Sequence, residues 1–96
     1  MEKINLGFKL PVIFLREKKK FVAYSPVLDL STSGKTFKEA QKRFIEIATI
    51  FFKEIVGKGT INEVLEDLGW QRAKKEWRPP VMISNQPETI NIPVNV

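Results

Sequence analysis

The sequence predicts an α+β domain in which a three-stranded antiparallel sheet is covered by a long helix and a short helix. Three observations lead to this fold class. Apolar and polar residues alternate in the first third of the chain, apolar residues recur at steps of three and four from Phe37 to Ile55, and two Thr-x-x-Glu patterns mark helix starts. The 96 residues suit one domain near the lower end of the usual size range.

The first predicted strand spans residues 4–14, where every second residue is apolar. Such alternation is typical of a strand with one buried face. Pro11 has no N–H to donate to a neighbouring strand, which places this segment at a sheet edge or at a bulge. The apolar positions are Ile4, Leu6, Phe8, Leu10, Val12 and Phe14.

Two shorter strands are predicted next. The charged residues 16–20 indicate a solvated turn, and residues 21–25 indicate a strand that returns from it to complete a hairpin. After Pro26, the alternation over residues 27–32 predicts a third strand. Residues 33–35 (Ser-Gly-Lys) predict the turn that leads from this strand into a helix.

The long helix is predicted to begin at Thr36, because Thr36 and Glu39 form a capping box. Its apolar stripe is broad enough to cover a sheet, and Gly57 and Gly59 end it.

The short helix follows at once and is predicted from a second capping box, Thr60 with Glu63. It extends to Leu68, and Gly69 stands where a C-terminal cap glycine belongs.

We assign residues 1–70 to this domain and residues 71–96 to a tail that holds four of the six prolines. The tail has no helical period, and its alternating apolar residues predict an extended, strand-forming segment. Such a tail can complete its own sheet, exchange into a second subunit or add as a strand to a partner protein. Its candidate partner contacts are Val81, Ile83, Ile90 and Ile92.

The chain contains neither cysteine nor histidine. This excludes Cys/His zinc sites, Ser-His-Asp triads, Cys-His pairs and imidazole general bases. Asp29 is the only acid within the three predicted strands, whereas metal-dependent cleavage of phosphodiesters needs several converging carboxylates. We therefore expect a binding protein with no catalytic residue, no metal and no cofactor.

The net charge of +5 resides at the two ends of the chain, and the middle is nearly balanced. The run Lys18-Lys19-Lys20 is a candidate phosphate contact, although a charge run at a hairpin tip is also explained as a solvated turn. Trp70 and Trp77 bracket a second basic group, and aromatic rings among cations can stack on bases. We assign Trp70 to the core and Trp77 to a surface anchor for a protein partner. The cations of this second group are Arg72, Lys74, Lys75 and Arg78.

The segment from Phe21 to Ala40 resembles the HicB-like antitoxins. The pattern of that family is a strand reading yvAyxP, then a strand that ends in GxT, then xEA at the start of a long helix. Here these pieces read Phe21-Val22-Ala23-Tyr24-Ser25-Pro26 and Gly34-Lys35-Thr36-Phe37-Lys38-Glu39-Ala40, and the similarity covers residues 4–69. The resemblance implies a reduced ribonuclease H-like fold that has lost catalysis.

The resemblance further implies an antitoxin that binds and masks a small HicA-type mRNA-cleaving toxin. Tyr24, Ser25 and Asp29 are candidate contacts at a sheet edge, together with Trp77 and the tail. Tyr24 is also explained as a core aromatic residue whose hydroxyl reaches water, and both explanations stay open for Asp29.

We expect a cytoplasmic homo-oligomer, a dimer or tetramer, because cysteine is absent and a chain this short buries a modest core. No apolar run is long enough to span a membrane. Many relatives add a helix-turn-helix or ribbon-helix-helix module for operator DNA, which the proline-rich tail does not supply, so DNA binding stays open. The competing hypothesis is a solitary nucleic-acid-binding domain that uses the two basic groups.

Overall fold

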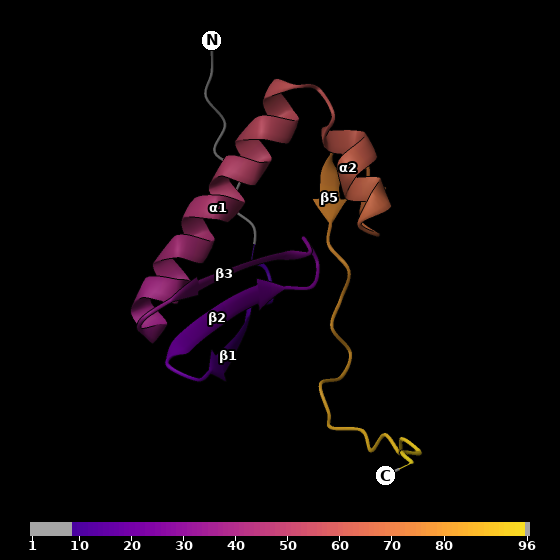
Figure 1. Cartoon of the computed structure of the whole chain (residues 1–96). Coiled ribbons are helices and arrows are strands. Elements are labelled where there is room, and N and C mark those ends of the chain that lie inside the picture. Colours follow the sequence, from indigo (N-terminus) through magenta and orange to yellow (C-terminus); the bar gives the residue numbers. More distant parts are fainter. Residues whose placement is uncertain (1–8, 96) are drawn as a thin grey trace.

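The computed structural model describes residues 9–95 and confirms the α+β class (Figure 1). Its main sheet is antiparallel in the order β1–β2–β3, and α1 packs against this sheet. A short helix and a separate two-stranded sheet follow. The elements are β1 (Ile13–Glu17), β2 (Lys20–Ser25), β3 (Leu30–Gly34), α1 (Phe37–Gly57), α2 (Ile61–Asp67), β4 (Gln71–Ala73) and β5 (Glu76–Arg78).

The first strand begins later than the alternation predicts. Residues 4–8 lie outside the described residues, and residues 9–12 form no strand. β1 starts two residues after Pro11, whose nitrogen cannot donate a ladder hydrogen bond. Leu10 and Val12 still pack against the two core clusters, so the alternation indicated their burial correctly but not their conformation.

The turn predicted over residues 16–20 is only two residues long. Glu17 pairs with Lys20, which leaves Lys18 and Lys19 to reverse the chain. Lys18 has a positive φ of 55°, a conformation that costs a side-chain-bearing residue energy and is confined here to the tip of the turn.

The third strand was placed too early by the pattern of residues 27–32. Val27 and Leu28 are 4% and 2% exposed, but they lie in the connection between β2 and β3. Asp29, with a φ of 51°, turns the chain so that Leu30 pairs with Ser25. Because alternation reports which side chains are buried, it could not separate a buried turn from a strand. Residues 33 and 34 of the predicted turn belong to β3.

The start of α1 agrees with its capping pattern. The Thr36 hydroxyl accepts a hydrogen bond of 3.0 Å from the backbone amide of Glu39, and Thr36 has the extended backbone of an N-cap residue. The helix ends at Gly57, as predicted, and Gly59 follows with a φ of 70°. Its buried side chains are Ala40, Phe44 and Ile55.

The start of α2 differs from its capping pattern. Thr60 precedes the helix but makes no side-chain cap bond, and its hydroxyl instead donates a long bond of 3.5 Å to the carbonyl of Ile55. The C-terminal end is as predicted, because Gly69 follows the helix with a φ of 87°.

Within residues 9–95 the core has two clusters, and α1 contributes residues to both. One lies between α1 and the sheet and contains Ala23, Ala40 and Phe44. The other lies around the far end of α1 and the β2–β3 connection, where α2 and Trp70 close it. Its buried residues are Val27, Leu28, Ile55, Leu65 and Trp70.

The segment after residue 70 begins with the β4–β5 hairpin, which the sequence pattern did not indicate. Trp77 of β5 packs against the second core cluster. From Pro79 to Asn95 the chain carries no helix or strand and extends away from the body (Figure 1). The radius of gyration of 16.8 Å reflects this extension, since a compact domain of this length has about 12–13 Å.

Within residues 9–95, neither helix has the length and apolar character that crossing a lipid bilayer requires.

Candidate functional site

Tyr24 and Asp29 form a polar pair beside the sheet. The Tyr24 hydroxyl donates a hydrogen bond of 3.2 Å to Oδ1 of Asp29. Partial burial, then the hydrogen bond and the negative charge of Asp29, raise the pKa of the Tyr24 phenol above its ordinary value. The prediction that Asp29 lies within a strand is wrong, because Asp29 precedes β3 in a turn.

Tyr24 belongs to the face of the main sheet that lies opposite α1. Neighbouring residues of a strand point to opposite faces, and the Ala23 side chain packs against α1. On the open face, Ile13 pairs with Tyr24 and Leu15 pairs with Val22. Leu15 is 55% exposed. The open face thus offers an apolar surface, defined here by Ile13, Leu15, Val22 and Tyr24.

Ser25 is not on that surface. It is fully buried, and its hydroxyl has no hydrogen-bond partner among the described residues. A partner protein could contact this side chain only if the surrounding core opened.

The two tryptophans occupy different depths. Trp70 is 3% exposed, and its indole N–H donates a hydrogen bond of 2.8 Å to the carbonyl of Val27. This confirms its assignment to the core. Trp77 is half-buried, and the guanidinium of Arg72 lies 5.9 Å from the centroid of its ring. Trp77 therefore presents only part of its ring to a partner.

The tail residues predicted as partner contacts are largely exposed to solvent. The exposed fractions of Val81, Ile83, Ile90 and Ile92 are 83%, 95%, 75% and 74%. The base of the tail lies near the body, since Pro80 and Val81 line a shallow groove with Pro26 and Val27. Beyond it, the apolar side chains up to Asn95 project from extended chain with no strand partner among the described residues.

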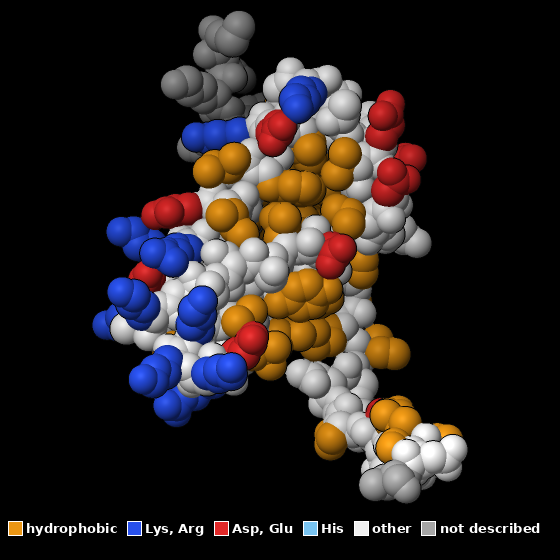
Figure 2. Space-filling model, viewed as in Figure 1, with side chains coloured by type: hydrophobic (Ala, Val, Ile, Leu, Met, Phe, Trp, Pro, Cys, Tyr) orange, Lys and Arg blue, Asp and Glu red, His pale blue; other side chains and the backbone are white. Residues whose placement is uncertain are grey.

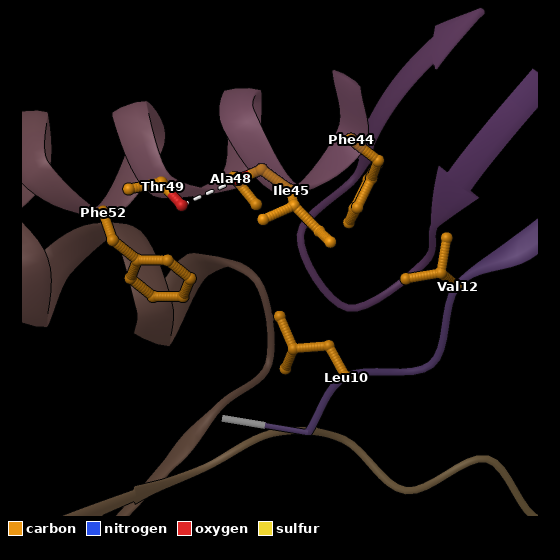
Figure 3. Close-up of a pocket in the computed structure, with 7 residues that line it drawn as sticks. All are labelled: Leu10, Val12, Phe44, Ile45, Ala48, Thr49 and Phe52. Atoms are coloured by element: carbon orange, nitrogen blue, oxygen red, sulfur yellow. Dashed lines mark hydrogen bonds between the residues drawn. The ribbon is translucent and has the colours of Figure 1, made fainter. Parts of the chain in front are cut away.

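A second, larger groove runs between α1 and the segment before β1 (Figure 3). Its volume is about 300 Å³, and Leu10 and Val12 face the helix across it. Ile45 lines it while remaining 61% exposed. Apart from the Thr49 hydroxyl, which donates to the carbonyl of Ile45 at 2.7 Å, the lining side chains are apolar. The groove offers packing surface but no catalytic constellation.

No group of three or more acidic residues within residues 9–95 is placed to hold a metal ion. The acid that lies within a strand of the main sheet is Glu17 of β1, which corrects the prediction that Asp29 is the strand acid.

The two predicted basic groups lie on different hairpins and do not meet. Lys18, Lys19 and Lys20 are at the β1–β2 turn, whereas Arg72 to Arg78 lie on the β4–β5 hairpin beside α2. The two basic groups are separated by the length of β2, because the β4–β5 hairpin packs near the Val27 end of the sheet.

The structure instead adds five other cations to the three lysines of the β1–β2 turn. Figure 2 shows Lys and Arg side chains gathered over that turn and the adjoining start of α1. We call this cluster the basic end. Its residues are Arg16, Lys18, Lys19, Lys20, Lys35, Lys38, Lys42 and Arg43. Lys35, Lys38, Lys42 and Arg43 were not predicted from the sequence. Only the register of β2 with β3 places them beside the cations of residues 16–20.

Comparisons with family models, with curated proteins and with solved structures gave no match to this chain.

Proposed function

We propose that this protein is a HicB-like antitoxin, with a reduced ribonuclease H-like fold, that binds and masks a small HicA-type mRNA-cleaving toxin. The observation that carries the proposal is the segment from Ala23 to Ala40, which has the order of pieces found in that family. In this proposal, the protein acts in the cytoplasm as a dimer or tetramer and has no catalytic activity of its own.

Packing supports the resemblance, because several residues of the pattern join α1 to the sheet. Ala23 and Ala40 are both 0% exposed and belong to the same core cluster. A Cβ on Gly34 would lie 2.6 Å from the backbone nitrogen of Ala40, so glycine permits the close approach of helix and strand. Thr36 caps the helix through the Glu39 amide.

The absence of histidine and cysteine from the sequence supports a binding role over a catalytic one. Asp29, in the connection between β2 and β3, accepts the hydrogen bond of Tyr24. Among the described residues it belongs to no group of three or more acidic residues that could hold a metal ion.

The tail is the proposed toxin-binding element. The five residues between Pro87 and Pro93 each have a backbone N–H that can donate a hydrogen bond. Among these five residues, Ile90 and Ile92 point to one side of an extended chain. A strand of this kind gains affinity from main-chain hydrogen bonds to a partner's sheet edge and specificity from its alternating side chains. The open face, with the exposed Leu15, is the proposed contact between copies of the chain.

Co-expression with the product of a neighbouring small reading frame tests the proposal. We expect a tagged form of this protein to retain that product in a pull-down and to inhibit its cleavage of mRNA. Ile90→Asp with Ile92→Asp should abolish both effects, because two charges on the binding side of the tail would have to be buried in the complex.

The matched control places the same two charges on the other side of the tail, as Asn91→Asp with Asn95→Asp. These variants should keep toxin binding. The proposal fails if no neighbouring product is retained, and its tail contact fails if both pairs of substitutions act alike.

A further inference from the structure

The charge of this protein is concentrated at one end. The segments 16–20 and 35–43 contain eight lysines and arginines against two glutamates, whereas the rest of the chain has eight against nine. Acidic side chains gather on the opposite side of the molecule in Figure 2, over α2, which carries Glu63, Glu66 and Asp67. The whole positive excess of the molecule thus belongs to the basic end.

The sheet register and the packing of α1 produce this concentration. Phe21 pairs with Gly34, so the next residues outward, Lys20 and Lys35, continue the same two neighbouring strands. The start of α1 is held at this end because the guanidinium of Arg43 donates a hydrogen bond of 3.0 Å to the carbonyl of Ser33.

Most of these cations have no acidic partner among residues 9–95. Arg43 forms a salt bridge of 2.7 Å with Glu39, and it is the only residue of the basic end that does so within residues 9–95. The three lysines at the β1–β2 turn and Lys35, Lys38 and Lys42 are exposed. Their charges repel one another unless an anion neutralises them, which favours a polyanionic ligand.

An exposed aromatic ring lies within the same end. Phe37, the first residue of α1, is 46% exposed, although its ring packs against Phe14 with centroids 4.5 Å apart. Phe14 and Arg16 share one face of β1, and Lys38 directly follows Phe37 in α1, so each ring of this pair has a cation of the basic end as a neighbour on its own element. Cations around an accessible ring are the elements with which proteins hold unpaired nucleotides.

We propose that the basic end binds single-stranded RNA, with its lysines on the phosphates and one base stacked on Phe37. A duplex would satisfy the lysines but would offer no free base to the ring, and an acidic protein would satisfy the lysines without using the ring as a stacking platform. This activity goes beyond toxin binding and does not depend on it, because the tail and the basic end are different surfaces.

The test uses the anisotropy of a fluorescein-labelled oligouridylate titrated with the full chain at several salt concentrations. Lys18→Gln with Lys19→Gln should lower the affinity at low salt by about tenfold. It should also flatten the plot of log affinity against log salt by about 1.4, since each phosphate contact on a single strand contributes roughly 0.7 to its slope.

The chain supplies a closely matched control in its other hairpin. Lys74 and Lys75 also form a two-residue turn, and Lys74 has a φ of 58° where Lys18 has 55°. Lys74→Gln with Lys75→Gln removes the same net charge from the same kind of turn, and we expect it to leave RNA affinity unchanged. Equal losses from the two pairs would overturn the proposal, since they would show an effect of net charge alone.

Phe37→Leu separates stacking from charge. It keeps an apolar side chain against Phe14 and should weaken RNA binding about fivefold or more without altering the salt slope, because a base loses its aromatic platform. Its thermal unfolding should remain one cooperative transition, which shows that the fold is kept. Absence of binding at low salt, or affinity for duplex RNA equal to that for the single strand, would contradict the proposal.

Discussion

Gly34 sets how closely α1 approaches the sheet, and its effect on stability can be measured. Gly34→Ala places a Cβ 2.6 Å from the Ala40 nitrogen, a backbone atom that cannot move alone. We expect a loss of about 2–3 kcal/mol in the free energy of unfolding, as for other overpacked sites. Gly57→Ala is the control, since its Cβ meets nothing within 4 Å and its φ is not positive. That change should stabilise the helix end by about 0.5 kcal/mol. Urea unfolding of both variants decides between these expectations.

Tyr24 is the only tyrosine of the chain, so its ionisation can be followed by ultraviolet absorbance without interference from another phenol. Its pKa is raised, which means that the folded protein holds the phenolic proton more tightly than the unfolded chain does. The resulting contribution to stability is present below the unfolded pKa of about 10 and is lost as the pH rises through the folded value.

Asp29→Asn should bring the measured pKa of Tyr24 down towards its ordinary value, because the carboxylate that disfavours the phenolate is removed. An unchanged titration curve would show that Asp29 does not influence Tyr24 in solution.

At the scale of elements, the two Thr-x-x-Glu patterns have different outcomes. Thr36→Ala removes a formed cap bond and should cost about 1 kcal/mol, whereas Thr60→Ala removes no cap bond and should cost clearly less. Chemical denaturation of the two variants measures the difference, and equal losses would contradict the assignment. The sequence could not distinguish the two threonines, because the decisive difference is in their backbones. Thr36 is extended, whereas Thr60 has φ −103° and ψ 8°.

Strand boundaries were harder to predict than helices for a related reason. The steps of three and four between the apolar residues of α1 indicate a helix, and the cap at Thr36 fixes where this helix begins. Alternation reports only which side chains are buried, so it also matched the turn residues Val27 and Leu28. The β4–β5 hairpin was missed because two strands of three residues are too short to show a period.

At the scale of the whole molecule, the sequence predicted the α+β class, because amphipathic patterns determine which faces must be covered. It could not predict the basic end. Residues 16–20 and 35–43 meet only through the register of β2 with β3, which no single window of sequence contains. The apolar tail residues Ile90 and Ile92 could be selected from their alternation, but their exposed fractions of 75% and 74% could not be predicted, because alternation by itself indicates one buried face.

Trp70 connects distant parts of the molecule and gives a global stability prediction. Trp70→Phe removes the indole N–H and leaves the buried carbonyl of Val27 without that donor, which should cost about 2 kcal/mol. Trp77→Phe, at a half-buried position, should cost less than about 1 kcal/mol. Thermal and urea unfolding would measure both changes, and a larger effect at Trp77 would reverse the assignment of core and surface.

The hydrogen bond from Trp70 to Val27 joins residues 43 positions apart, whereas the strands of the main sheet are connected by short turns. Contacts between chain neighbours form with the smallest loss of chain entropy, so we expect the sheet and the start of α1 to assemble first. The cluster around Leu65 and Trp70 then closes over the far end of α1. In the folded protein we expect local opening in the reverse order, so that the backbone amides of α2 and of the β4–β5 hairpin exchange with solvent before those of β2.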